Sequence, residues 1–563
     1  MLKQSVARSL RLVQLRVQRR TTARLVLARA RARQVFGRAT PRSVAGSTAA
    51  GRVQGPTEQR RADTVVVKLQ GTPVEARVDP GLHLSTQRRA AFDLVKSALV
   101  DAGLQCWHLP RIGIGRLVLG VDAADRHAVQ TVLAAHPVLR HWYRDRLNHR
   151  GQLTSRLERA GDGLPDSVPA IAVWEHVVAD PNSSFGASEL QGVEIQFWTR
   201  PEDALEPTFM SPVPSATVTL LLESEVRDLQ GAAPAMFHRR HASKVGFDID
   251  IVYTWVDGSD ETWLAQKLAA SGRPSGRVHT ERAHDESRFA DHDELRYSLR
   301  SVEQFAPWVN HIWIVTSGQR PAWLADHPKV TVVSHQEIWP DQEGLPTFNS
   351  HAIEACLHRI PGLSEHFLYL NDDMIFGRPV APELFFQGSG LGRFFWSRAL
   401  VDYLPSYRGE IASTSAAKNA RRLIEERFGV TVSRKFFHAA YPLRVSVLEE
   451  LEREFPDVFK ATRRASFRTT DDVAAAGSLY FNYAYVTGRA VPGVIRYDYV
   501  DPAVPIGLAK MDNILRNRTF DAFCINDGGT PQTMEERQDT DREIRRFLAT
   551  YLPVRSEFEI EQS

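Results

Sequence analysis

The chain has 563 residues, of which 43% are hydrophobic and 24% are charged, and its formal net charge is +3. These values are ordinary for a soluble globular protein of about two to four domains, and they exclude a polycation that would bind nucleic acid along its whole length. The cysteines Cys106, Cys356 and Cys524 are too far apart in sequence for a zinc motif, and so sparse a set is typical of a reducing compartment. No apolar run is long enough to predict a transmembrane helix, and the recurring arginines near the start argue against a secretory signal.

Residues 1–62 differ in composition from the rest of the chain. Arginine, alanine, leucine and valine dominate, and no acidic residue precedes Glu58. Segments such as 10–17 have the pattern of a basic amphipathic helix, which predicts a peripheral contact with an anionic membrane, at the inner face of the plasma membrane. Two alternatives stay open: a disordered basic tail, and translated sequence upstream of the true start.

Residues 63–245 are predicted to form a separate accessory α/β domain. Apolar runs predict strands at 64–69, 116–121, 193–198 and 216–222. Helical periodicity predicts helices at 88–102 and 125–135. No grouping of carboxylates, histidines or glycines in this part suggests catalysis. We interpret it as a supporting or acceptor-positioning domain.

Residues 246–529 repeat a pattern of apolar strands followed by helical or loop segments. The predicted strands are 250–256, 311–316, 329–333 and 367–370. This βα pattern predicts an α/β fold with a mainly parallel twisted sheet of the Rossmann-like, nucleotide-sugar-transferase type. Helices are predicted at 293–303, 350–360, 415–428, 444–455 and 535–552, the last within a C-terminal helical segment, 530–563.

Acidic residues follow two of these strands. Asn371, Asp372 and Asp373 come directly after strand 367–370, and Asp257 follows strand 250–256. Ligands of open α/β folds bind at the carboxyl edge of the sheet, and adjacent carboxylates there repel unless a cation such as Mg²⁺ neutralises them. The alternative is an ordinary solvated turn at each place.

Capping and charge patterns add detail to the helices. Ser350 is expected to cap helix 350–360, and Ser259 or Asp260 the helix that follows Asp257. On helix 293–303, Arg296 and Arg300 lie four residues apart on the side opposite the apolar face. That side is either solvated or, near a phosphate, an anion clamp.

Four blocks, in order, resemble the conserved regions of the Stealth family, which includes bacterial capsular and exopolysaccharide hexose-1-phosphate transferases. The segment IDIVYTWVDGSD (249–260) resembles the first region. Residues 288–319, together with residues 345–377, which contain FLYLNDDMIFG, resemble the second. The segment from SRKFFHAAYP to FRTTDD resembles the third, and FDAFCINDG the fourth. The resemblance covers about 247–529, and the layout of the whole chain is most similar to the actinobacterial-type exopolysaccharide phosphotransferases.

The resemblance implies transfer of a sugar-1-phosphate from a UDP-sugar to a hydroxyl of a polysaccharide or oligosaccharide acceptor, with release of UMP, in the cytoplasm. The family's essential residues fall on Glu354, Asp372, Asp373, His438 and Arg468, and its first-region aspartate falls on Asp257. We expect Asp257, Asp372 and Asp373 to hold Mg²⁺ or Mn²⁺. We expect a further set to bind the cofactor or the nucleotide-sugar: Tyr253, Asp257, Arg296 and Asn371.

The chemistry of pyrophosphate cleavage needs such residues. Catalysis of this kind is mostly positioning and electrostatic stabilisation. Arg468 is suited to donate a bidentate pair of hydrogen bonds to phosphoryl oxygens. Either His438 or Glu354 would take the proton of the acceptor hydroxyl, and the sequence does not separate them. Taken alone, His438 would be an aromatic-packed core histidine and Arg468 a surface arginine.

Two other functions compete with this one. A metal-dependent glycosyltransferase would use the same carboxylates and nucleotide-sugar but release UDP. A protein that binds anions or nucleic acid through its arginine-rich start would not be an enzyme, and we expect no nucleic-acid partner. The sequence does not indicate an oligomeric state.

Overall fold

The computed structural model of the chain describes residues 64–69, 72–111, 113–154, 157–182, 185–272, 278–280, 283, 289–407, 409–526 and 533–561. The prediction of a basic membrane-contacting segment falls on residues 1–62, which lie outside the described residues. Among the helices that are described, none has the length and apolarity that crossing a membrane requires.

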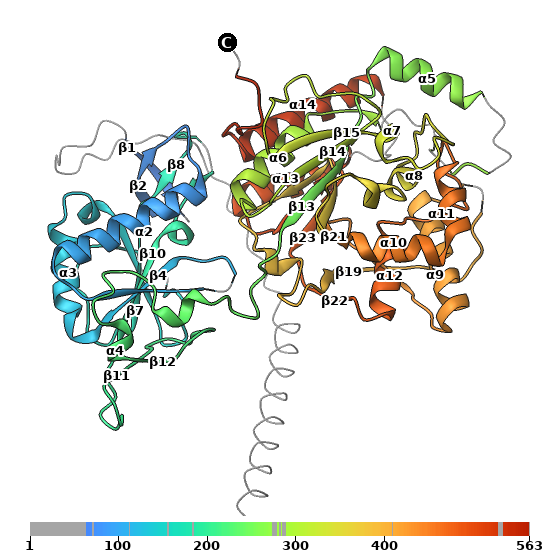
Figure 1. The fold of residues 1–563 in the computed structure, drawn as a ribbon. Coiled ribbons are helices and arrows are strands. Elements are labelled where there is room, and N and C mark those ends of the chain that lie inside the picture. The colour runs from blue at the N-terminus through green and yellow to red at the C-terminus, as the bar shows by residue number, and fades with distance from the viewer. Residues whose placement is uncertain are drawn as a thin grey trace, which may run out of the picture. The chain divides into compact units, whose positions relative to one another are not determined.

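The strands between residues 64 and 222 pair only with one another among the described residues. A six-stranded mixed sheet has the order β3-β4-β10-β7-β5-β6. Helices α2 and α3 pack on it through Phe92, Val95, Val129 and Leu133 (Figure 1). The main elements are β1 (Thr64–Leu69), β2 (Thr72–Val78), α2 (Leu84–Asp101), β3 (Cys106–Leu109), β4 (Leu117–Asp122), α3 (Arg126–Ala135), β5 (Tyr143–Leu147), β6 (Glu158–Arg159), β7 (Ala170–Trp174), β8 (Val177–Val178), β9 (Gly186–Ala187), β10 (Val193–Trp198), β11 (Thr208–Met210), β12 (Leu220–Leu222) and α4 (Glu223–Val226).

A second sheet lies at the centre of the C-terminal part and confirms the predicted α/β class. Its order is β15-β14-β13-β16-β21, with the first four strands parallel and β21 antiparallel at the edge. These strands are β13 (Ile249–Thr254), β14 (Ile312–Thr316), β15 (Val330–Ser334), β16 (His366–Asn371) and β21 (Tyr441–Arg444). Because this order requires crossovers between parallel strands, helices come to cover both faces of the sheet.

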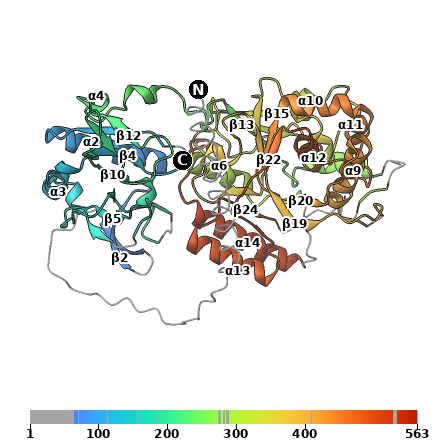
Figure 2. The same cartoon turned by 90° about the horizontal axis from the view of Figure 1, so that it is seen from below.

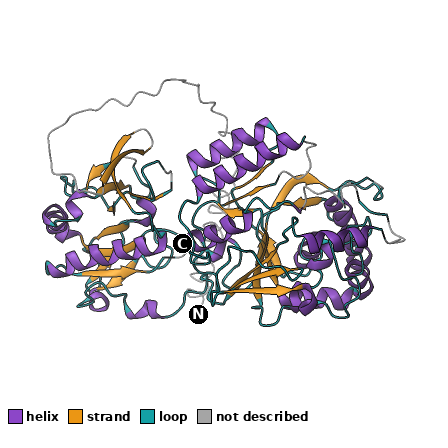
Figure 3. Cartoon of the chain, turned by 90° about the horizontal axis from the view of Figure 1, so that it is seen from above, coloured by secondary structure: helices purple, strands orange, loops and turns teal. Residues whose placement is uncertain are grey.

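Both faces of this sheet are buried, which explains why its strands are nearly continuous apolar runs. In β16, Leu368 and Leu370 point into one core cluster, while Phe367 and Tyr369 point into another. The first cluster includes apolar residues of α6 and α14, and the second includes those of α9, α10 and α12. In Figure 1, α6 and α14 lie on one side of the central strands and α9, α10 and α12 on the other, and Figure 3 shows purple helices on either side of the orange strands.

The remaining elements of this part complete the two helical layers, and α13 and α14 run side by side (Figure 2). They are α5 (Glu261–Ser271), α6 (Glu294–Phe305), α7 (His335–Ile338), α8 (Ser350–Glu354), β17 (Met374–Phe376), β18 (Gly392–Phe394), β19 (Trp396–Leu400), α9 (Ala412–Phe428), β20 (Arg434–Phe436), α10 (Val445–Glu454), α11 (Pro456–Arg463), α12 (Ser478–Val486), β22 (Ala490–Pro492), β23 (Tyr497–Val500), α13 (Pro505–Asn517), β24 (Ala522–Ile525) and α14 (Met534–Tyr551).

The predicted helix 350–360 is shorter than expected, and its predicted cap is wrong. Helix α8 ends at Glu354, and a separate turn of 3-10 helix follows at Leu357–Arg359. Asn349 caps α8, since its side-chain oxygen accepts a hydrogen bond from the His351 amide at 3.1 Å. The Ser350 hydroxyl is used elsewhere, by Arg468. The predicted cap Asp260 is confirmed, because its carboxylate accepts from the Trp263 amide at 2.7 Å.

Candidate active site

The carboxyl ends of the parallel strands meet at one edge of the central sheet. Thr254 of β13 pairs in register with Asn371 of β16 and with Val315 of β14, and Thr316 of β14 pairs with Ser334 of β15. The residues that follow these strands therefore lie along one line. In open α/β folds this edge is where ligands bind.

Asp373 is buried at this edge, with 6% of its surface exposed. One carboxylate oxygen, Oδ2, accepts hydrogen bonds from the Cys524 thiol at 3.2 Å and from the Asn526 amide at 2.7 Å. The other oxygen, Oδ1, has no hydrogen-bond partner and lies 3.9 Å from His438 Nε2. Asp373 is thus held by groups at the end of β24 and turns a free oxygen toward the imidazole.

His438 lies between Asn371 and Tyr441. Its Nε2 is 3.3 Å from the Asn371 amide nitrogen, and its Nδ1 is 3.4 Å from the Tyr441 hydroxyl. In the tautomer that uses both contacts, the Asn371 amide donates to Nε2 and Nδ1–H donates to Tyr441. Burial lowers the pKa of His438, with Arg468 adding to the effect and Asp373 opposing it. The imidazole is therefore neutral at neutral pH, with its lone pair near Asp373.

Acidic groups crowd around Asp372. Burial and the nearby carboxylates Asp373, Glu294 and Asp291 raise its pKa well above the ordinary value. Burial likewise raises the pKa of Glu294 to about 8. Buried carboxylates that repel one another, together with the unpartnered oxygen of Asp373, fit a hard divalent cation, which would neutralise them with the oxygen ligands that it prefers.

Asp257 stabilises the turn that follows β13 through hydrogen bonds within that turn. Its Oδ1 accepts from the Ser259 amide at 2.8 Å and from the Ser259 hydroxyl at 2.6 Å. Its negative charge also contributes to raising the pKa of Asp291. The structure therefore places Asp257 near the edge of the acidic group but gives it no contact with Asp372 or Asp373, and its role as a metal ligand stays a prediction.

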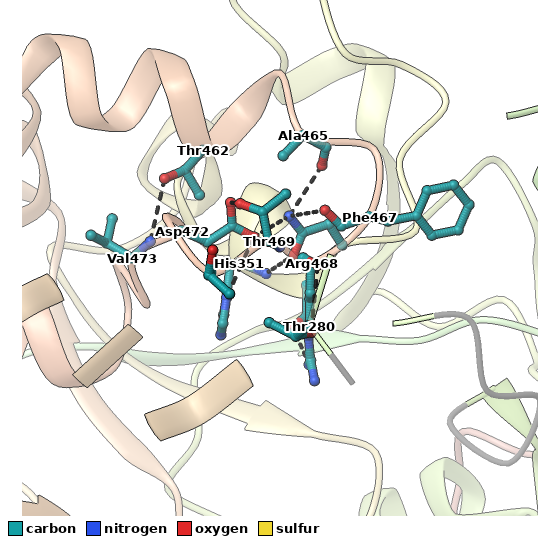
Figure 4. Close-up of polar contacts among 12 residues, drawn as sticks. Thr280, His351, Thr462, Ala465, Phe467, Arg468, Thr469, Asp472 and Val473 are labelled. Carbon is teal, nitrogen blue, oxygen red and sulfur yellow. Dashed lines mark hydrogen bonds and ion pairs between the residues drawn. The ribbon is translucent and has the colours of Figure 1, made fainter. Parts of the chain in front are cut away.

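Arg468 belongs to a loop that several buried side chains hold in place (Figure 4). Asp472, with 1% of its surface exposed, accepts from the Thr469 amide at 2.8 Å, from the Thr469 hydroxyl at 2.7 Å and from the Asn349 amide at 2.8 Å. Arg468 Nη2 donates to the Ser350 hydroxyl at 2.6 Å, while its Nε has no partner. The guanidinium is positioned by α8 and retains a donor for a ligand.

Two cavities adjoin at Ser350, Asn371 and Arg468, which line both. The smaller, of about 130 Å³, runs along the strand ends and has aromatic walls. The larger, of about 400 Å³, is lined by His438 and Glu354 among others. The Arg468 guanidinium can therefore reach a ligand in either cavity, which is the arrangement that a two-substrate reaction needs.

Glu354 lies at the end of α8, where it lines the larger cavity. Its Oε2 is buried and has no hydrogen-bond partner. Burial raises its pKa, and His351 and Arg468 partly offset this. A carboxyl with a raised pKa is suited to donate a hydrogen bond, and His438, with a lowered pKa, is the better proton acceptor.

Two residues that the sequence assigned to binding lie outside both cavities. Arg296 Nε donates to Glu559 at 2.6 Å, and Arg300 pairs with the same carboxylate. The two arginines do clamp an anion, but it is a side chain of the protein itself. Tyr253 is fully buried, and its hydroxyl is 2.7 Å from the Ser298 hydroxyl. Both assignments are corrected accordingly.

The sequence interpretation missed several residues that shape the site. Cys524 and Asn526 orient Asp373, and Asp291 and Glu294 join the acidic group. The position of Asn526 within FDAFCINDG, the block that resembles the fourth conserved region, was a usable signal. The position of Glu294 was not, because a glutamate at the first turn of a helix is usually explained by the helix dipole.

Residues of this site lie within segments of the chain that match known protein families. Family models of the four conserved regions of Stealth proteins match residues 247–274, 288–394, 437–485 and 512–563. The fourth region thus extends beyond residue 529 and includes α14 and Glu559, within the segment 530–563 that was predicted to lie outside the resemblance.

Curated relatives match most of the chain. Exopolysaccharide phosphotransferase SCO6023 of Streptomyces coelicolor is 40% identical over 86% of this chain and 84% of its own length. Exopolysaccharide phosphotransferase CpsY of Mycobacterium tuberculosis is 36% identical over 89% of this chain and 93% of its own. Exopolysaccharide phosphotransferase CpsY of Mycobacterium leprae is 37% identical over 89% of this chain and 92% of its own length. These matches extend well beyond the four conserved regions.

A solved structure also matches part of the chain. It is the galactosyltransferase LgtC in complex with donor and acceptor sugar analogs, 13% identical, covering 55% of this chain and 97% of that one with a TM-score of 0.29. A likeness at this level supports no conclusion about the present site.

Proposed function

The chain belongs to the family of Stealth proteins, and from this premise we propose that it transfers a sugar-1-phosphate from a UDP-sugar to a hydroxyl of an acceptor sugar, releasing UMP, in exopolysaccharide synthesis. The observation that carries the proposal is the position of Arg468 between two cavities, with the imidazole of His438 and the acidic group on its two sides. Curated relatives of nearly full length are named exopolysaccharide phosphotransferases, which supports a transferase that moves phosphate-linked sugars.

In this proposal the donor occupies the smaller cavity and the acceptor the larger. The pyrophosphate of the donor lies at the shared wall, where Arg468 Nε and the rest of its guanidinium donate to phosphoryl oxygens. Ser350 holds the guanidinium in place from the other side. Charge on the phosphoryl oxygens is thus met by a fixed donor, which is the main contribution that a protein makes to this reaction.

His438 accepts the proton of the acceptor hydroxyl at Nε2, where the bound hydroxyl takes the place of the Asn371 amide as hydrogen-bond donor. The neutral imidazole is available at neutral pH because burial lowers its pKa. The imidazolium that forms lies 3.9 Å from the unpartnered oxygen of Asp373, which stabilises its charge. Glu354 lines the same cavity and, with its raised pKa, donates a hydrogen bond to the acceptor or to phosphate.

Asp372 and Asp373 would hold Mg²⁺ or Mn²⁺, with Asp291 and Glu294 close by. When bound, such an ion supplies positive charge against the pyrophosphate of the donor. The chain's own contribution is to keep several carboxylates together at a cost in repulsion, which the raised pKa values of Asp372 and Glu294 reflect.

The experiment that tests the proposal is an incubation of the full chain with Mg²⁺, a panel of UDP-sugars and oligosaccharide acceptors, with nucleotide products separated by chromatography. We expect UMP and a product with a phosphodiester linkage, both dependent on acceptor. Release of UDP without a phosphodiester would identify the alternative, a metal-dependent glycosyltransferase. Release of neither nucleotide from any donor of the panel would contradict both.

The raised pKa of Glu294 predicts how the cation affects stability. Because that pKa is about 8 in the folded protein and 4.5 ordinarily, folded Glu294 binds a proton that the unfolded chain has lost, and its contribution to stability falls as the pH rises between these values. Cation binding to the deprotonated group offsets this loss. We expect Mg²⁺ to raise the midpoint of thermal unfolding by roughly 2 °C more near pH 8.5 than near pH 6.

The matched control for this prediction is Glu294→Gln, which keeps the size of the side chain and removes its titration. In that variant the difference between the two pH values should shrink. An equal Mg²⁺ effect at both pH values in the unmodified protein would show that these carboxylates do not take up the cation.

A further inference from the structure

Three buried polar side chains in the smaller cavity have atoms without hydrogen-bond partners, and the mechanism above uses none of them. They are the indole N–H of Trp255, the hydroxyl of Ser317 and Nε2 of His335. Trp255 and His335 are each only 7% exposed. An unsatisfied buried polar atom destabilises the folded state, so three in one cavity point to a ligand that completes the hydrogen bonds.

The three residues share a position in the fold. Each is the first residue after one of three neighbouring parallel strands: Trp255 follows β13, Ser317 follows β14 and His335 follows β15. Neighbouring strand ends therefore direct these side chains into one cavity. Asn371 is the last residue of β16 and Asp372 follows it, at the opposite end of the same row.

The cavity is consequently divided along its length. Arg468, Ser350 and Asp372 form a charged end beside β16. The end of the cavity next to β14 and β15 carries the neutral polar atoms of Ser317 and His335. Aromatic rings of Trp263, Phe289 and Phe348 line the cavity as well, with the Trp263 and Phe348 centroids 5.2 Å apart.

We propose that Trp255, Ser317 and His335 form a subsite that reads the base of a nucleotide, with a pyrimidine as the occupant. This inference rests on the proposed function, which places a nucleotide-sugar here, and deepens it by assigning recognition of the base to three side chains. A ligand that is charged at one end and planar, with polar edges, at the other matches the division of the cavity.

The chemistry of the three groups matches the edge of uracil. The indole N–H is a donor only, and it pairs with a carbonyl oxygen. Burial lowers the pKa of His335 to about 4, so its ring is neutral and Nε2 accepts the N–H between the two carbonyls in the Nδ1–H tautomer. The Ser317 hydroxyl donates to the second carbonyl. Flat aromatic side chains in the same cavity offer stacking surface for the ring.

Calorimetric binding to the full chain in the presence of Mg²⁺ tests the proposal, with UMP, CMP, AMP and inorganic pyrophosphate as separate probes. We expect UMP to bind at least about tenfold more tightly than AMP, which has a larger ring. His335→Ala and Ser317→Ala should each weaken UMP binding by about tenfold and leave pyrophosphate binding unchanged, because pyrophosphate contacts only the charged end.

His311→Ala is the matched control, since His311 directly precedes β14 at the opposite edge of the same sheet. It should leave UMP binding unchanged, and circular dichroism would verify that all variants are folded. Equal affinity for UMP and AMP, or equal losses for UMP and pyrophosphate in both variants, would overturn the subsite. CMP binding as tight as that of UMP would overturn the assignment of the uracil edge. Such results are distinct from failure of the proposed function, in which pyrophosphate itself would not bind.

Discussion

His438→Ala should lower turnover by about 10²–10⁴-fold while leaving the fold intact, because the acceptor hydroxyl then has no base in contact with it. His438 is half-buried in the wall of the larger cavity and belongs to neither core cluster of the central sheet, so its loss is not expected to unfold the protein. Steady-state release of nucleotide from the donor, measured against pH, is the readout. In the unmodified enzyme the rate should rise with pH through an apparent pKa below the ordinary value of 6.5.

The variant should lose that rise, and added imidazole should restore part of the rate. His311→Ala serves again as the control, because it removes an imidazole at the opposite edge of the sheet. A His438→Ala enzyme that keeps both its turnover within about tenfold and the same pH dependence would transfer the role of base to Glu354.

The central sheet could be predicted because burial on both of its faces leaves a direct trace in the sequence. The run 367–370 predicted a strand, and β16 spans His366–Asn371. Its acidic end was visible for the same reason, since Asp372 and Asp373 interrupt an apolar run. Hydrophobic periodicity reports the local environment of each residue, and for this strand the local environment was enough to predict its position.

Contacts between distant segments could not be predicted in the same way. Arg468 donates to Ser350, 118 residues earlier, and Cys524 donates to Asp373, 151 residues earlier. No local pattern specifies such pairs, and only the family resemblance brought His438 and Arg468 into the predicted site. Neither route indicated Cys524, because its position within a buried strand is explained equally well by packing.

The error about Arg296 has a clear physical origin. Two arginines four residues apart on a helix are suited to bind an anion, and the sequence pattern is the same whether that anion is a phosphate or a carboxylate of the chain. Here the partner is Glu559, 263 residues away, whose pKa the two arginines help to lower to about 2 despite its burial. The prediction that these arginines bind an anion is therefore correct, and the prediction that the anion is a phosphate is wrong.

The site also shows why binding residues can be destabilising. Buried carboxylates repel one another around Asp372, and three polar atoms in the smaller cavity lack partners. Each of these features costs free energy of folding in the absence of ligand, and each is explained by a charge or hydrogen-bonding group that a substrate or cation would bring. Asp372 and the three polar side chains line one cavity, Asp372 at its charged end and the other three at its neutral end.

Asp373→Asn should lower turnover by about a thousandfold or more and leave the free energy of unfolding unchanged or slightly higher. The asparagine oxygen can keep the hydrogen bonds from Cys524 and Asn526, while its amide nitrogen takes the place of the oxygen that faces His438. The substitution therefore removes one negative charge and little else. It also relieves Asp372 of a repelling neighbour, so the pKa of Asp372 should fall.

Turnover, thermal unfolding and Mg²⁺ binding by calorimetry together distinguish the possible roles of Asp373. We expect the turnover and the Mg²⁺ affinity to fall in the same variant whose unfolding midpoint is preserved. Asp512→Asn, on α13, removes an equivalent charge from an exposed position that lines neither cavity and should change none of the three. If Asp373→Asn loses activity only in proportion to a loss of folded protein, then Asp373 is a structural residue. A preserved fold with lost turnover and lost Mg²⁺ affinity places the charge of Asp373 in the chemistry, because the substitution otherwise only turns the atom that faces His438 from an acceptor into a donor.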